Sequence, residues 1–273
     1  MALTVNTNIA SLNAQRNLAK TQLSLNQSLQ RLSSGLRINS AADDAAGLAI
    51  SEGMKAQIRS MNQDIRNAND GVSLVQVAEG ALNEVSNILG RMRELATQAA
   101  TGTVAASQRS YINSEFGRLA SEITRIASAT AFNGLHLLNG ATTTLDIQVG
   151  TGTSAFNTIT LSLTAMDATT LAVGTVINTS ALAKAMQSTI DAAITKVSGQ
   201  RANLGAAQNR FQSVINNLQV AVENTSAAQS RIADADIAAE TANMTRANIL
   251  VQAGTAILAQ ANQAPQAALK LLQ

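Results

Sequence analysis

Apolar residues recur at helical spacing along most of this 273-residue chain, and the spacing predicts several long helices. A stripe with this spacing covers one face of a helix and has to pack against another helix. Two such stripes lie near the chain ends, each with members seven residues apart: Leu18, Leu25 and Leu32, then Met244, Val251 and Leu258. Because neither terminal helix can bury its stripe alone, we expect the two to pack on each other.

Three further stripes lie between these ends, where apolar positions alternate by three and four over 58–96, 112–126 and 186–221. Sustained alternation of this kind is typical of a coiled-coil seam. In the 58–96 stripe, the apolar positions shift by one residue between Gly71 and Gly80. This shift predicts a local change in helix winding.

Helix ends are indicated by a few residues. Gly35, after two serines, should end the first helix, because glycine readily adopts the left-handed conformation of a helix C-terminus. Thr101-Gly102-Thr103 separates the 58–96 stripe from the 112–126 stripe. Two Asn-Gly pairs within 131–140 predict turns. Pro265, the single proline, predicts that the last helix stops there.

The segment 141–180 has a different pattern. In ATTTLDIQVG and TITLSL, polar and apolar residues alternate, and a GTGT run separates the two. Alternation of β-branched residues on either side of glycines predicts a β-hairpin. The expected fold is therefore mainly α, a long antiparallel helical rod or coiled coil built from both chain termini, with a small β-hairpin region in the middle.

Composition argues against catalysis. Hydrophobic residues make up 46% of the chain but aromatic residues only 2%, so narrow alanine-rich helical seams are expected rather than a thick core. Cysteine is absent and histidine occurs once, which excludes disulfides, thiol nucleophiles and paired-histidine zinc sites. No phosphate-binding loop or nucleophile elbow is present. We expect no enzyme, no catalytic residue, no metal and no cofactor.

Charge and hydropathy limit the partners. The net charge of +2 is too small to indicate nucleic acid. No stretch has enough consecutive apolar residues to span a bilayer, so no membrane partner is expected. The N-terminal MALTVNTNIASLNAQRN is not a cleavable secretory signal, so export would need another route.

The stretch LSSGLRINSAADDAAGLAIS, residues 32–51, contains the adjacent carboxylates Asp43 and Asp44. Paired carboxylates can form a metal site, an acid/base pair or a helix cap. No histidine, cysteine or acidic cluster accompanies them, which favours stabilisation of the positive start of the following helix. Arg31 and Arg37 are expected to hold this connector against acidic groups of the same or an adjacent subunit.

Long motifs at both ends resemble bacterial flagellin, including NTNIASLNAQRNL, LSSGLRINSAADDAAGLAIS, RNANDGVSLVQVAEGALNEV and FNGLHLLNG, then QRANLGAAQNRF and ENTSAAQSRIADADIAAETANMTRANIL. The resemblance implies a subunit that polymerises helically into the flagellar filament and transmits motor rotation for swimming. It also implies five segments: 1–43, inner-tube helix and connector; 44–140, rod helices; 141–180, a short variable hairpin; 181–230, rod helix; 231–273, inner-tube helix.

Partners follow from the same resemblance. They are further copies of this chain, a flagellum-specific type III export apparatus with its flagellin chaperone, and the filament cap and hook-junction proteins, with the product outside the cell. Two other interpretations remain open at this point: a hook–filament junction component, and a secreted helical module that acts on host receptors or membranes.

The motif GRMRELATQ, residues 90–98, resembles the segment through which many flagellins are bound by Toll-like receptor 5. On that resemblance, Arg91, Leu95 and Gln98 would contact the receptor, together with Glu115 from the next helix. The alternative is an ordinary rod surface that packs between subunits.

Overall fold

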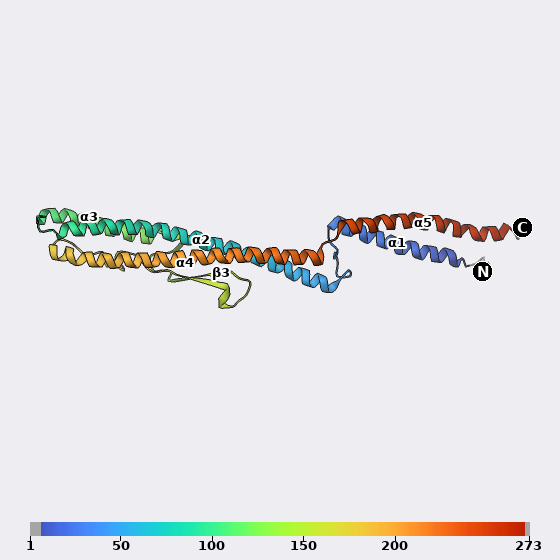
Figure 1. The fold of residues 1–273 in the computed structure, drawn as a ribbon, viewed down its shortest axis with the longest axis horizontal. Coiled ribbons are helices and arrows are strands. Elements are labelled where there is room, and N and C mark those ends of the chain that lie inside the picture. Colours follow the sequence, from blue (N-terminus) through green and yellow to red (C-terminus); the bar gives the residue numbers. More distant parts are fainter. Residues whose placement is uncertain (1–6, 271–273) are drawn as a thin grey trace. The chain divides into compact units, whose positions relative to one another are not determined.

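The computed structural model describes residues 7–270, which divide into two compact units. Unit 1 comprises 1–56 and 224–273, and unit 2 comprises 57–223, so two long helices contribute to both. The elements are α1 (Ile9–Ser34), α2 (Ala45–Ala100), α3 (Ala106–Ala129), β1 (Ala131–Phe132), β2 (Leu135–His136), β3 (Thr144–Gln148), the short 3-10 helix η1 (Ala155–Asn157), β4 (Thr158–Ser162), α4 (Ser180–Ala233) and α5 (Ile237–Lys270) (Figure 1).

The fold class is confirmed. The chain is mainly helical, α1 packs on α5, α2 packs on α4, and the strands form two small antiparallel hairpins. In Figure 1 the α1 and α5 ribbons run side by side, as do α2 and α4. The apolar periodicity therefore predicted both the helices and the pairing of the two chain ends.

Both ends of α1 are capped, and Gly35 ends the helix as the sequence predicted. The Asn8 side chain accepts the Ser11 N–H at 3.0 Å and satisfies one of the free donors of the first turn. Gly35 has φ of 72° and donates its N–H to the Arg31 carbonyl at 2.8 Å. A side chain at position 35 would be strained in this left-handed conformation, which explains the glycine.

The core of unit 2 lies along the seams predicted for α2, α3 and α4. Large side chains from all three helices are fully buried there, among them Leu82, Leu89, Phe116 and Phe211. At the phase change, Gly71 is itself buried, and a Cβ atom on it would come within 2.8 Å of Phe211 Cζ. A residue without a side chain is needed for this close approach.

The hairpin of β3 and β4 pairs in the register Leu145 with Leu161 and Ile147 with Ile159. Its inner side chains belong to the same core as α2 and α4. The buried amide of Gln200 on α4 donates to the Ser162 carbonyl at 2.8 Å. The hairpin is therefore a part of unit 2 and not a separate body.

The segment of Asn-Gly pairs contains more structure than the sequence predicted. Asn133 and Gly134 have φ of 48° and 81° and form a two-residue turn between β1 and β2. Two successive residues with positive φ are characteristic of the tight turn that matches the twist of a hairpin. The turn was predicted, but the strand pairing on either side was not.

The prediction that the last helix stops at Pro265 is wrong, because α5 continues to Lys270. Proline removes one N–H donor and crowds the preceding turn, but it does not forbid helix on both sides of itself. The sequence rule therefore placed this boundary too early.

Candidate functional site

The helices α1 and α5 pack in antiparallel orientation, and polar contacts fix their register at both ends. Near the start of α1, the Asn8 side-chain amide donates to the Ala261 carbonyl at 2.7 Å. Near its end, the Arg31 guanidinium lies 3.9 Å from the Glu240 carboxylate. This helix pair is the main contact of unit 1.

The apolar residues predicted for this seam are only part of it. Leu25 is buried, while Leu18, Leu32, Met244, Val251 and Leu258 are half-buried. Sequence reasoning missed the seam positions between them, because they are small or polar: Ser11, Ala14, Thr21 and Ser28 on α1, and Ala247, Gly254 and Ala261 on α5. Their spacing of three and four from the apolar positions is the signal that would have identified them.

Large side chains in this seam face small ones. A Cβ atom placed on Gly254 would lie 3.2 Å from Leu18 Cδ1, so the leucine packs directly over the glycine. Seven residues further along α1, the same antiparallel register brings Leu25 level with Ala247, and both are buried. Small residues let the two backbones approach closely, but the resulting contact is narrow.

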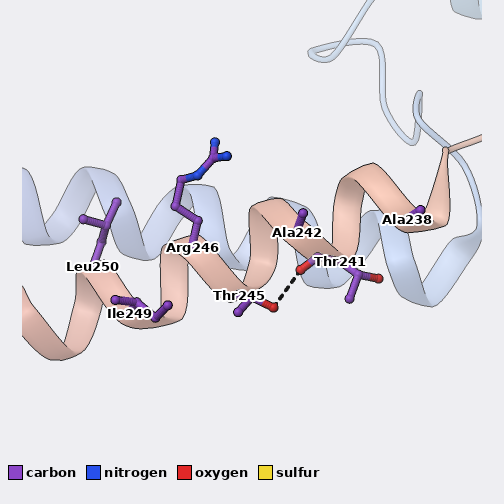
Figure 2. Close-up of a pocket in the computed structure, with 7 residues that line it drawn as sticks. All are labelled: Ala238, Thr241, Ala242, Thr245, Arg246, Ile249 and Leu250. Atoms are coloured by element: carbon purple, nitrogen blue, oxygen red, sulfur yellow. Dashed lines mark hydrogen bonds between the residues drawn. The ribbon is translucent and has the colours of Figure 1, made fainter.

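Because the seam is narrow, large hydrophobic side chains of both helices remain exposed. We call the following residues the outer α1/α5 face; their exposed fractions lie between 47% and 66%: Ile9, Leu12, Leu23 and Leu29 on α1, with Ile237, Ile249, Leu250 and Ile257 on α5. Figure 2 shows Ile249 and Leu250 beside Thr245 and Arg246, lining a shallow pocket on α5. Exposed apolar side chains gathered on one helix pair indicate an interaction surface.

The connectors of unit 1 meet in a joint, formed by residues 35–44 between α1 and α2 and residues 234–236 between α4 and α5. Its backbone is paired: Leu36 forms an isolated antiparallel bridge with the second connector, and the Arg37 N–H donates to the Ala233 carbonyl at 2.7 Å. The two connectors therefore hold each other through main-chain hydrogen bonds as well as side chains.

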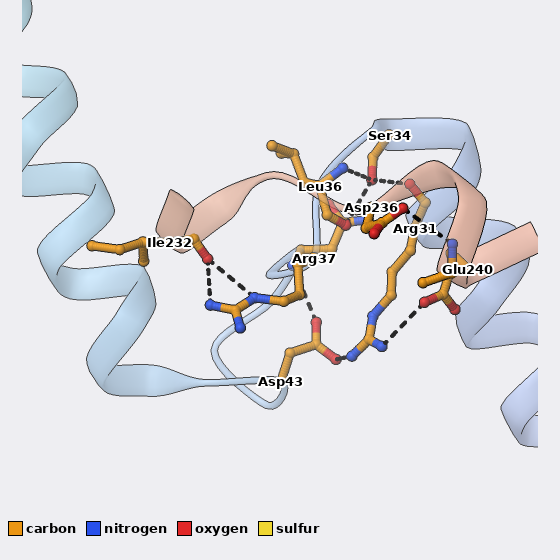
Figure 3. Close-up of polar contacts among 10 residues, drawn as sticks. Arg31, Ser34, Leu36, Arg37, Asp43, Ile232, Asp236 and Glu240 are labelled. Carbon is orange, nitrogen blue, oxygen red and sulfur yellow. Dashed lines mark hydrogen bonds and ion pairs between the residues drawn. The ribbon is translucent and has the colours of Figure 1, made fainter. Parts of the chain in front are cut away.

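Two arginines reach into this joint (Figure 3). Arg31 lies 4.0 Å from Asp43 and 3.9 Å from Glu240, so it contacts acidic groups, as expected. Arg37 does not. Its guanidinium donates to the Ile232 carbonyl at 2.6 Å and 3.2 Å. The last carbonyls of α4 lack helical partners and carry partial negative charge, so they take the place of a carboxylate.

The two adjacent carboxylates of the joint have different partners. Asp44 accepts the Gly47 N–H at 2.9 Å and caps the start of α2. Asp43 instead accepts the Ser40 and Asn39 N–H groups at 3.0 Å and 3.2 Å, closing a turn within the connector. These hydrogen bonds favour the charged form and lower the pKa of Asp43. The sequence had placed both carboxylates at the helix start, and the structure separates them.

A third carboxylate of the joint was not predicted to have a role. Asp236 accepts the N–H groups of Ala238 and Ala239 at 2.9 Å and 3.1 Å, which makes it the N-cap of α5. An aspartate directly before a helical apolar pattern was the available signal. Both helices that leave the joint therefore begin on an aspartate.

The residues singled out for receptor contact do not all lie on one surface. Arg91 pairs with Glu115 of α3 at 2.9 Å and with Glu94 at 2.9 Å, and these hydrogen bonds raise the pKa of Arg91. Gln98 is exposed. Leu95, by contrast, is only 2% exposed and belongs to the core of unit 2, so its expected role as a contact residue has to be corrected. It lies at a core position of the α2 stripe, between the buried Met92 and Ala99.

Two further properties concern residues 7–270 as a whole. None of the helices described there is long and apolar enough to cross a membrane. Over the same residues, no three or more histidine, cysteine or acidic side chains come together as metal ligands would.

Comparisons with known proteins identify the family. Residues 5–143 match the bacterial flagellin N-terminal helical region, and residues 187–272 match the C-terminal helical region. The chain is 47% identical over 276 residues to a flagellin of Halalkalibacterium halodurans, covering 98% of this chain and 99% of that protein. It is 43% identical over 284 residues to the flagellar filament 33 kDa core protein of Treponema phagedenis, with coverages of 98% and 99%.

A solved structure supports the same conclusion. The crystal structure of Bacillus cereus flagellin is 36% identical, superposes with a TM-score of 0.51, and covers 56% of this chain and 88% of its own. The two matching regions include α1, α2, α3 and α5, and α4 from residue 187 onward. The residues between them, 144–186, contain the β3–β4 hairpin and the first turns of α4. The chain therefore belongs to the bacterial flagellin family and is a structural, non-enzymatic subunit of the extracellular flagellar filament.

Proposed function

We propose that the outer α1/α5 face is the surface through which copies of this chain polymerise in the filament core. The observation that carries the proposal is the exposure of large side chains such as Leu23, Ile249 and Ile257, at 60% or more, on a helix pair whose own seam is narrow. Burying each in a neighbouring copy would contribute about 1.5–3 kcal/mol. Side chains of this kind are costly to leave in water, so assembly has a clear driving force.

The proposal assigns segments to layers of the filament. Segments 1–43 and 231–273 form the inner-tube layer, and segments 44–140 and 181–230 form the rods, with 141–180 as a short variable hairpin. The joint supports this division, because helices begin and end there. Gly35 ends α1, Asp44 begins α2 and Asp236 begins α5. The middle segment is short, so no large outer domain is expected.

Polymerisation of surface variants tests the proposal. Replacing Leu23 and Ile257 together by serine should leave the helicity of the monomer unchanged, because both side chains are exposed, yet should abolish filament growth from short seeds. Phe156→Ser, which removes a 97% exposed side chain from unit 2, is the matched control and should elongate normally. Normal elongation of the double variant, measured by light scattering and electron microscopy, would contradict the proposal.

We also propose that Arg91, Gln98 and Glu115 form part of a contact for Toll-like receptor 5. The ion pair between Arg91 and Glu115 is the supporting observation, since it joins two helices into one exposed polar surface. Leu95 takes part only by supporting α2 from the core.

Binding of the monomer to the receptor ectodomain, measured by surface plasmon resonance, tests this second proposal. Arg91→Ala should weaken binding at least about tenfold, a typical effect for an arginine at a contact centre. Arg125→Ala, which removes a similarly exposed arginine paired with Glu122 elsewhere on α3, should not. Equal affinity of the Arg91 variant and the unaltered chain would exclude the contact.

The remaining partners are proposed from membership of the family alone. They are a type III export apparatus with a flagellin chaperone, and the cap and hook-junction proteins. Pull-down of the full chain with each purified candidate would test them one at a time, and a candidate that retains no chain at micromolar concentration would be removed.

A further inference from the structure

One buried acidic group of unit 2 has no partner. Asp64 lies on α2 and is 5% exposed, and its Oδ2 atom is buried without a hydrogen bond. Buried carboxylates are normally paired, because removing a charge from water is costly. The usual compensation is missing at this position.

The neighbours of Asp64 along the helix are apolar. Met61 and Ala68, one turn before and one turn after it, are 4% and 0% exposed and face the same seam. At the next turn, Gly71 packs against Phe211 of α4. Asp64 therefore occupies a seam position in which every neighbouring turn of α2 contributes an apolar contact.

No charge on the surrounding elements compensates for it. The charged residues nearest in the chain or in the adjoining parts of unit 2 are Arg59, Arg66 and Asp70 on α2, Arg210 and Glu223 on α4, and Asp146 on β3. Arg66 is engaged by the Gln63 side chain, and Asp146 accepts the Thr160 hydroxyl. Across residues 7–270, none of the ion pairs or hydrogen bonds involves the Asp64 carboxyl group.

We propose that Asp64 is a proton-sensitive weak point in the seam between α2 and α4: the seam closes when this carboxyl group is protonated and loosens locally when it is charged. The consequence is a section of unit 2 that opens more readily in neutral or alkaline medium than in mildly acidic medium. This property concerns unit 2 alone and does not depend on which surface drives polymerisation.

The direction of the pH effect follows from the protonation equilibrium. Burial raises the pKa of Asp64 above the ordinary aspartate value in the folded chain. The unfolded chain then releases the proton at lower pH than the folded chain does. The contribution of Asp64 to the free energy of unfolding therefore falls as the pH rises from the ordinary aspartate range through the raised pKa. Above that pKa the contribution of Asp64 no longer changes with pH.

Thermal unfolding of Asp64→Asn across pH tests the proposal, because asparagine keeps the shape and removes the charge. At pH 8 we expect the Tm of the variant to exceed that of the unaltered chain by about 2–4 °C, and the difference should vanish near about pH 4. Taking the difference at each pH cancels the effects of every other titrating group. Asp70→Asn is the matched control, an exposed aspartate on the same helix, and should show no such trend.

A second variant keeps the test decisive if the buried amide is itself unfavourable. Asp64→Leu should unfold at a higher temperature than the unaltered chain at pH 8 and lose the same pH dependence. Hydrogen exchange of peptides 57–70 and 211–223, corrected for intrinsic rates, should show protection falling with pH only when Asp64 is present. A difference between Asp64→Asn and the unaltered chain that does not change with pH, or the same trend in Asp70→Asn, would overturn the proposal.

Discussion

The two compact units bury their seams to very different depths. In unit 2, side chains such as Leu82, Leu89 and Phe211 are 0% exposed and belong to one continuous core. In unit 1, the equivalent leucines Leu18 and Leu32 are only half-buried in the α1/α5 seam. The same spacing of apolar residues therefore produces a closed core in one unit and an open helix pair in the other.

The difference lies in how many elements meet at each seam. The core of unit 2 receives side chains from α2, α3, α4 and the β3–β4 hairpin, so each stripe is covered from several directions. The α1/α5 seam has two helices, and its small residues such as Gly254 and Ala247 bring the backbones close without adding apolar area. Unit 2 has the core of a stable domain, whereas unit 1 leaves apolar side chains exposed, which is the basis of the proposed contact with other copies.

The largest effect that distinguishes the units should come from Phe211→Ala. Phe211 is fully buried and packs against Gly71, so its loss leaves a cavity and should lower the free energy of unfolding by about 3–5 kcal/mol. Chemical denaturation of the monomer followed by circular dichroism measures this. Phe156→Ala, at a 97% exposed phenylalanine, should change stability by less than about 0.5 kcal/mol. Similar losses in both variants would mean that the core is not where the structure places it.

A smaller effect is expected in unit 1 from Leu25→Ala. Leu25 is 8% exposed opposite Ala247, and removing it should weaken the α1/α5 seam by about 2 kcal/mol, at the low end for a buried leucine. Hydrogen exchange should accelerate in α1 and α5 while unit 2 is unchanged.

Leu23→Ala, two residues earlier and 66% exposed, is the matched control. It should leave hydrogen exchange of the monomer unaffected but weaken filament elongation, because its side chain belongs to the outer α1/α5 face. If the two leucine variants have the same effects on monomer and filament, the division between seam and outer face is wrong.

The smallest of the three effects concerns the joint. Asp44→Ala removes the N-cap of α2 and should cost about 1 kcal/mol, whereas Asp44→Asn keeps an acceptor and should cost less. Asp43→Ala should instead free the turn at Ser40. We expect the double replacement of Asp43 and Asp44 by alanine to weaken filament assembly or change the shape of the filament, as seen by electron microscopy.

The contribution of Asp43 should depend on pH. Because hydrogen bonds from Ser40 and Asn39 lower the pKa of Asp43, its stabilising contribution is present above the ordinary carboxyl range and is lost as the pH falls through the lowered pKa. The melting temperatures of Asp43→Ala and the unaltered chain should therefore converge on acidification.

Unchanged polymerisation and waveform in the double variant of Asp43 and Asp44 would show that the joint tolerates the loss of both groups.

The sequence by itself determined the helices, their main ends and the pairing of the two termini. These features depend on local chemistry: apolar spacing selects one face of a helix, and Gly35 acts within a turn of its own position. The hairpin of β3 and β4 was predicted for the same reason, since alternation at every second residue specifies a strand. Pro265 shows the limit of such rules, because α5 continues past it.

Only the tertiary structure decided which residues of each stripe are buried and what the polar ones contact. Ser28 and Gly254 belong to the α1/α5 seam although neither is hydrophobic, because position on the helix and not residue type places them there. Leu95 is inside the core, Arg37 binds a carbonyl, and Asp64 is buried without a partner. The burial or contact of each of these residues depends on a second segment far away in the chain. The sequence does not say how close two such segments lie in space.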